Sequence, residues 1–126
     1  MQRNGSKTPK PIWWVGRSKD AFEQFPHEVQ EDMYHAFEVA QWGSKAPSAK
    51  PMKGFRGAGV LEIIENHGGD AYRAVYTVKF RAAVCVLHVF QKKSKRGIRT
   101  PRREMRIIEA NLRGLIEYMK NQESAE

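Results

Sequence analysis

Four polar side chains in the middle of the chain are of types that can cleave a phosphodiester. They are Glu62, Arg73, His88 and Lys92. Arginine and lysine donate hydrogen bonds to phosphate oxygens, so they can stabilise the charge that develops on a phosphorane. Glu62, His88 or a lysine in its neutral form could accept the proton of a ribose 2′-hydroxyl. This set of side chains could therefore cleave RNA without a metal ion.

These residues fall on segments with the two-residue alternation of β-strands. The predicted strands are 60–65, 72–79 and 83–91, with a turn signal at 66–70. Successive strand residues point to opposite faces, so Arg73 is expected on the face opposite Tyr72 and Tyr76. The same alternation predicts one shared face for Val86, His88, Phe90 and Lys92. We therefore expect an arginine, a histidine and a lysine to converge.

A structural interpretation exists for each of these residues. Arg73 could pair with Glu62 across the sheet. His88 could be a hydrogen-bonded histidine of the core. On the functional interpretation, Arg73 lies on a polar face, and the fold should tolerate its replacement by alanine. The tryptophans Trp13, Trp14 and Trp42 are expected in the core or at a protein interface, and not as platforms for nucleobases.

The positive charge is concentrated in the basic segment, residues 91–106. The whole chain carries a net charge of +8, and this segment has eight basic residues against a single acid, Glu104. Such a density of charge attracts polyanions, whereas a solvated basic face is the alternative. The basic residues are Lys92, Lys93, Lys95, Arg96, Arg99, Arg102, Arg103 and Arg106.

Composition and motifs exclude several other classes. A chain of 126 residues suits one domain, and no apolar run is long enough to span a membrane. The N-terminus lacks a secretory signal, and the single Cys85 cannot form an internal disulfide, so we expect a cytoplasmic protein. The four histidines lack the spacing of helical metal ligands, and no phosphate-binding or dinucleotide-binding loop is present. Neither a metal nor a cofactor is expected.

The remaining elements complete an α+β arrangement. A strand is predicted at 12–15, followed by a short helix from Ser18 and a second helix from Pro26 that ends at Gly43. Residues 43–59 read as a loop, and Thr100-Pro101 starts a closing helix with one apolar face. We expect a mobile N-terminal tail at 1–10, one domain at 11–120 and a C-terminal tail at 121–126.

Several of these segments resemble the HigB-like, phage-derived branch of the RelE/ParE toxin superfamily. The resemblance rests on Tyr72-Arg73-Ala74-Val75-Tyr76, on the run from Val86 to Ser94, and on Gly97 to Pro101. Trp14-Val15-Gly16 and the stretch from Lys50 to Phe55 match the same branch. The resemblance covers roughly residues 11 to 118 and implies the RelE-like fold: a strand and helix hairpin, an antiparallel meander and a C-terminal helix.

The resemblance also implies an activity and partners. Members cleave messenger RNA in the ribosomal A site without a metal ion, and a cognate antitoxin, commonly a helix-turn-helix protein, inhibits them. By position, Arg73 matches the strand arginine that stabilises the transition state, and Lys92 and Lys93 match basic residues after the last strand. The RNA-binding residues would then be Lys95, Arg96, Arg99, Arg102 and Arg103.

Two positions differ from the nuclease pattern of the superfamily. The strand that often carries a second basic residue reads Leu61-Glu62-Ile63-Ile64-Glu65 here, and no tyrosine lies near the start of the closing helix. Members that poison gyrase lack a nuclease site. A gyrase-poisoning toxin and an RNA-binding module that does not cleave are therefore the alternatives, although the basic segment favours RNA as the target.

Overall fold

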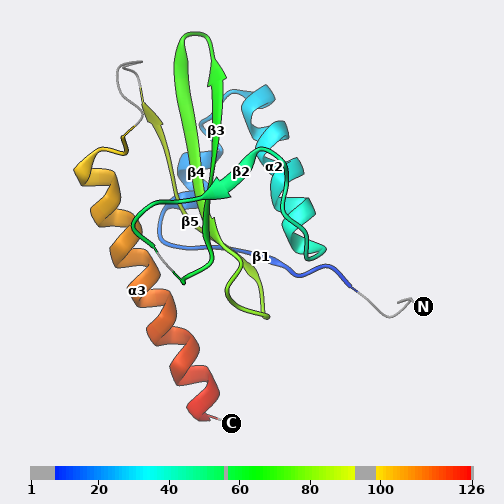
Figure 1. Cartoon of the computed structure of the whole chain (residues 1–126), viewed down its shortest axis with the longest axis vertical. Coiled ribbons are helices and arrows are strands. Elements are labelled where there is room, and N and C mark those ends of the chain that lie inside the picture. The colour runs from blue at the N-terminus through cyan, green and yellow to red at the C-terminus, as the bar shows by residue number, and fades with distance from the viewer. Residues whose placement is uncertain (1–7, 56, 93–98, 126) are drawn as a thin grey trace.

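The order of helices and strands follows the predicted one, with one additional strand (Figure 1). The computed structural model describes residues 8–55, 57–92 and 99–125. The elements are β1 (Ile12–Trp14), α1 (Ser18–Phe22), α2 (His27–Gln41), β2 (Ala49–Pro51), β3 (Val60–His67), β4 (Asp70–Thr77), β5 (Val84–Lys92) and α3 (Arg102–Ala125). None of the helices in these ranges is long and apolar enough to cross a membrane.

The strands form one mixed sheet in the order β1-β5-β4-β3-β2. Strands β3, β4 and β5 make the predicted antiparallel meander. Strand β1 extends the sheet parallel to β5, and β2 extends the other edge antiparallel to β3. Helices α1 and α2 cover one face, and α3 covers the other (Figure 1). The predicted α+β class is confirmed.

Each face of the sheet has its own apolar core. On one face, Phe22 and Phe37 of the helix hairpin pack against Tyr76. On the other face, the predicted apolar stripe of the closing helix packs against Val75 and Leu87 through Ile108, Leu112 and Leu115. Burying an aliphatic or aromatic side chain of this size contributes about 1.5–3 kcal/mol. The two cores hold the sheet rigidly between helices, so side chains on its α3 face have fixed positions.

Two turns follow the glycine signals in the sequence. Gly43, with φ of 91°, ends α2 in the left-handed region as predicted. Gly68 and Gly69 join β3 to β4 with φ of 60° and 88°. Two consecutive residues of positive φ make a tight hairpin whose twist matches that of the strands, which sets the register of the meander.

The boundaries differ from the expected ones in three places. Strand β2 lies within the stretch 43–59 that was predicted as a loop. Lys10, expected in a mobile tail, exchanges hydrogen bonds with Gln41: its backbone N–H donates to the Gln41 carbonyl at 2.9 Å, and Gln41 Nε2 donates to its carbonyl at 2.6 Å. Helix α3 continues through 121–125, which were expected as a C-terminal tail. Residues 1–7 lie outside the described ranges.

A β-bulge in β5 corrects the predicted alternation. Tyr76 pairs with Val86 but Val75 pairs with His88, so Leu87 is an extra residue. A bulge of this kind lets two successive side chains point to the same face. Val86 accordingly packs in the core under α2, on the face opposite His88, and does not share a face with it as predicted.

Two carboxyl groups, Asp32 on α2 and Glu65 on β3, lie close together, and their like charges repel each other. Burial raises the pKa of the Glu65 carboxyl above its usual value of 4.5, and the nearby, hydrogen-bonded carboxyl of Asp32 raises it further. A carboxyl whose pKa is raised by folding contributes stability at low pH, and this contribution is lost as pH rises through the folded-state pKa.

Asp32→Asn should therefore stabilise the protein near pH 7, because it removes a like charge from Glu65. We expect the melting temperature to rise by on the order of 1–3 °C at pH 7. The gain should shrink toward pH 4, where Glu65 is protonated in both proteins. Glu38→Gln, which removes an exposed acid from the same helix, is the control. A gain that is equal for both variants, or independent of pH, would contradict the assignment.

Candidate functional site

Arg73 lies at the centre of the sheet and joins three segments of the chain. Its side chain on β4 is buried, with only 3% of the residue exposed. Its Nη1 donates to Thr100 Oγ1 at 3.2 Å and lies 3.6 Å from Glu62 Oε1 on β3. Arg73 is on the face opposite Tyr72 and Tyr76, as predicted, and it makes the pair with Glu62 that the structural interpretation offered as the alternative.

The burial of this pair overturns one expectation. The fold was expected to tolerate Arg73→Ala, but this change would leave the Glu62 carboxylate, whose side chain is only 13% exposed, without its counter-charge. Removing one partner of a buried ion pair typically costs about 3–5 kcal/mol. Arg73 is therefore a structural residue as well as a candidate for chemistry.

Thr100 takes a different role from the predicted one. Thr100-Pro101 was expected to start the closing helix, but α3 begins at Arg102 and the Pro101 carbonyl accepts the N–H of Met105 at 3.0 Å. The Thr100 hydroxyl instead accepts the hydrogen bond from Arg73. The stretch just before α3 is thus fixed to the middle of the sheet.

The strand registers align three titratable residues in one transverse row. Lys50 on β2 pairs with Glu62 on β3, Glu62 pairs with Val75 on β4, and Val75 pairs with His88 on β5. With neighbouring strands about 4.8 Å apart, the backbones at Glu62 and His88 are separated by roughly 10 Å. A carboxylate and an imidazole therefore stand on the two sides of the central strand, on the face toward α3.

His88 is held by an acid from the start of α3. Its Nε2 lies 2.7 Å from Glu104 Oε1, and the ring stacks on Phe90 with centroids 5.4 Å apart. Both partners are mostly buried, with side chains 15% and 21% exposed. Glu104 is the single acid of the basic segment, and the first turn of a helix favours a negative charge. An acid isolated in a basic run was the sequence signal that could have identified this partner.

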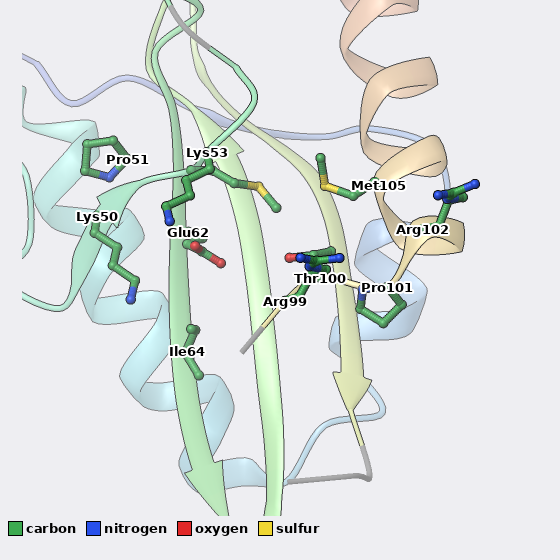
Figure 2. A pocket seen from close by; sticks show the side chains of 11 residues that line it. Lys50, Pro51, Lys53, Glu62, Ile64, Arg99, Thr100, Pro101, Arg102 and Met105 are labelled. Atoms are coloured by element: carbon green, nitrogen blue, oxygen red, sulfur yellow. The ribbon is translucent and has the colours of Figure 1, made fainter. Parts of the chain in front are cut away.

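A cleft of about 1000 Å³ opens between the β2 edge of the sheet and the start of α3 (Figure 2). Lys50 and Lys53 lie on the β2 side, and Arg99 and Arg102 belong to the opposite wall, with the guanidinium of Arg102 pointing away from Glu62. Glu62 and Ile64 from β3 lie between them, and Thr100 and Met105 complete the wall near α3. The cleft thus combines two cationic walls with one carboxylate.

The Glu62 carboxylate is an acceptor without a full set of donors. Among the described residues, no hydrogen bond reaches its buried Oε1, and Arg73 Nη1 stands at ion-pair distance. Buried polar atoms are normally hydrogen-bonded. The side chain itself lines the cleft and is 13% exposed, so the carboxylate presents part of its surface there.

The predicted site residues are only partly brought together. Glu62, Arg99 and Arg102 line the cleft, whereas Arg73 lies behind Glu62 and Thr100, and His88 behind the start of α3. Lys92 Nζ donates to the Arg99 carbonyl at 3.1 Å and so holds the cleft wall. Arg103 is exposed on α3 and is not among the lining residues. Lys93, Lys95 and Arg96 lie outside the described residues.

Sequence reasoning assigned no role to Lys50 and Lys53. Both lie in a stretch predicted as a loop, and only the pairing of β2 with β3 brings Lys50 opposite Glu62. A lysine on the neighbouring strand thus lies beside the Glu62 position of β3. Two lysines that flank a Pro-Met pair just ahead of the meander were the available signal.

Two buried groups are unsuited to nucleophilic or acid–base chemistry. Burial raises the pKa of the Cys85 thiol to about 11 and that of the Tyr76 hydroxyl to about 12. Both side chains are fully buried and keep their protons at neutral pH. Within the described ranges, no three histidine, cysteine or acidic side chains lie close enough together to hold a metal ion.

Comparison with known proteins adds a family and a fold. Residues 20–113 match the model of a family described as phage-derived Gp49-like proteins. The fold is similar to that of a mutant E. coli toxin RelE in the free state, with a TM-score of 0.51 and 17% identity over 70% of this chain and 86% of that chain. A chain of the RelBE2 toxin–antitoxin complex from Mycobacterium tuberculosis has a TM-score of 0.41 and 18% identity, covering 72% of this chain and 100% of that chain. No curated protein matches the sequence.

Proposed function

The chain belongs to the phage-derived Gp49-like family of RelE-type toxins within the RelE/ParE superfamily, and we propose that it cleaves messenger RNA on the ribosome without a metal ion. The observation that carries this proposal is the cleft with two cationic walls and the Glu62 carboxylate, backed by the buried guanidinium of Arg73. Cationic walls attract the phosphates of RNA, and the carboxylate supplies a proton acceptor.

The dimensions of the cleft favour a short single-stranded segment as the substrate. A volume of about 1000 Å³ is at the upper end of the range for small-molecule sites, and it is too small to hold a duplex. Lys50 and Lys53 would contact phosphates on one side, and Arg99 and Arg102 on the other. Ile64 and Met105 provide apolar surface for a base between the charged walls.

Cleavage uses the ribose as its own nucleophile. Glu62 accepts the proton of the 2′-hydroxyl, and the 2′-oxygen forms a bond to phosphorus. The bond from phosphorus to the 5′-oxygen then breaks, and His88, which does not itself line the cleft, gives that oxygen a proton through water, leaving a 2′,3′-cyclic phosphate and a 5′-hydroxyl. Glu104 orients His88 through the 2.7 Å contact.

Arg73 stabilises the phosphorane from beneath the cleft. Its guanidinium is held behind Glu62 and Thr100, in a medium where charge interactions are stronger than in water. A fixed cation at this place needs no reorganisation as negative charge develops on the phosphate oxygens. Lys92 keeps Arg99 in place through the backbone of that residue.

A toxin of this kind requires an inhibitor in the same cell. We propose a cognate helix-turn-helix antitoxin as the protein partner, the ribosome and messenger RNA as the targets, and the cytoplasm as the location. The support for these partners is membership of the family.

Expression of the chain without antitoxin should arrest growth and produce messenger cuts inside translated regions. Primer extension on total RNA locates the cuts, and Glu62→Gln, which removes the proton acceptor, should abolish them. Because this change also removes the counter-charge of Arg73, a melting curve must show that the variant is folded. Intact transcripts with accumulating DNA breaks would identify a gyrase poison instead. Growth arrest by Glu62→Gln at wild-type strength, with no cuts in either strain, would identify an RNA-binding module.

Each cationic wall should contribute to the salt dependence of ribosome binding. Lys50→Ser/Lys53→Ser and Arg99→Ser/Arg102→Ser should each flatten the slope of log affinity against log salt by about 1 to 2 units, because two phosphate contacts and their released counterions are lost. Arg113→Ser/Lys120→Ser removes the same charge from exposed positions further along α3 and is the control. An equal change in the control would mean that only the net charge matters.

A further inference from the structure

The bulge in β5 is held from two sides by polar contacts in an otherwise apolar region. The Val86 carbonyl accepts the N–H of Val15 at 2.9 Å and the hydroxyl of Ser18 at 3.2 Å. The carbonyl of Leu87, the extra residue, accepts from Asn111 Nδ2 at 2.7 Å. The turn after β1 and helix α3 thus each fix one carbonyl of the bulge.

The amide of Asn111 also lies close to the Gly16 backbone. Gly16 has φ of +58°, and a Cβ added there would lie 3.2 Å from Asn111 Nδ2. The amide therefore fits between the Gly16 backbone and the Leu87 carbonyl. Asn111 is half-buried beside the apolar stripe of α3, next to Leu112, where an amide is favoured by a hydrogen-bond partner.

The bulge decides which face of the sheet His88 occupies. Val84 and Val86 pack in the core under α1 and α2, so an uninterrupted alternation would send the next alternate residue, His88, into that core. With Leu87 inserted, both Leu87 and His88 face α3, and His88 reaches Glu104. The His88–Glu104 contact therefore depends on the bulge that the hydrogen bond from Asn111 stabilises.

We propose that Asn111 is a positioning residue that fixes the β5 bulge and thereby holds His88 on the cleft side of the sheet against Glu104. This inference rests on the proposed function only for its effect on cleavage, because the position of the His88 ring can be measured separately. Asn111 itself touches neither substrate nor the reacting atoms.

The test uses the ¹⁵N chemical shifts of the His88 ring together with single-turnover cleavage on ribosomes. In full-length Asn111→Leu the shifts should move to those of Glu104→Ala, in which the contact is also lost, and cleavage should fall about 10-fold or more. In a His88→Ala background, Asn111→Leu should cause no further loss. Ile116→Ala, which removes apolar packing from the same helix, should lower the melting temperature but leave the His88 shifts unchanged.

Wild-type His88 shifts in folded Asn111→Leu would overturn the inference. So would a shift of the same size in Ile116→Ala, because the effect would then reflect general loosening of α3. If Asn111→Leu does not fold, Asn111→Ser gives the same readout, because the serine side chain is too short to reach the Leu87 carbonyl. If wild type cleaves no RNA, the proposed function fails, while the His88 shifts still decide the role of Asn111.

Discussion

The site depends on the buried positive charge of Arg73, which needs a compensating partner. The guanidinium of Arg73 is enclosed in the sheet, where an uncompensated cation would cost several kcal/mol, so Glu62 and Thr100 must approach it. Glu62 brings β3 to Arg73, and Thr100 brings the stretch just before α3 to the same side chain. The cleft is the space that remains between these two partners and the β2 edge. The need to compensate the charge of Arg73 thus sets the positions of the segments around the cleft.

The sheet places the remaining chemistry relative to that charge. Register alone aligns Lys50, Glu62 and His88 across four strands, and the hairpin at Gly68-Gly69 fixes the register between two of them. The two apolar cores keep this row rigid, because each face of the sheet is covered by helices. Cationic side chains that differ by about fifty positions in sequence then face each other across the cleft, which suits a polyanion better than a flat basic patch does.

Local periodicity predicted most of the fold, and long-range contacts decided what it missed. The alternation of β3 and β4, the glycine turns and the apolar stripe of α3 each depend on neighbours within a few residues, so they are legible in the sequence. The face of His88 is not, because one inserted residue reverses the alternation and that insertion is stabilised by Asn111 and Ser18, which are distant in sequence. Strand β2 was missed because three residues that include a proline become a strand only beside β3. Among the candidate site residues, Arg73 and Glu62 were predicted from their types, whereas Lys50 and Glu104 became candidates only in the folded chain.

The central claim is that the buried Arg73 guanidinium both compensates Glu62 and stabilises the phosphorane. The most direct measurement is the single-turnover cleavage rate of Arg73→Lys on ribosomes programmed with messenger RNA, beside its melting temperature. Lysine keeps the positive charge for Glu62 but lacks the planar set of donors, so we expect a folded protein that binds ribosomes with wild-type affinity and cleaves about 10²–10³ times more slowly. A folded Arg73→Lys protein that cleaves at the wild-type rate would contradict the account.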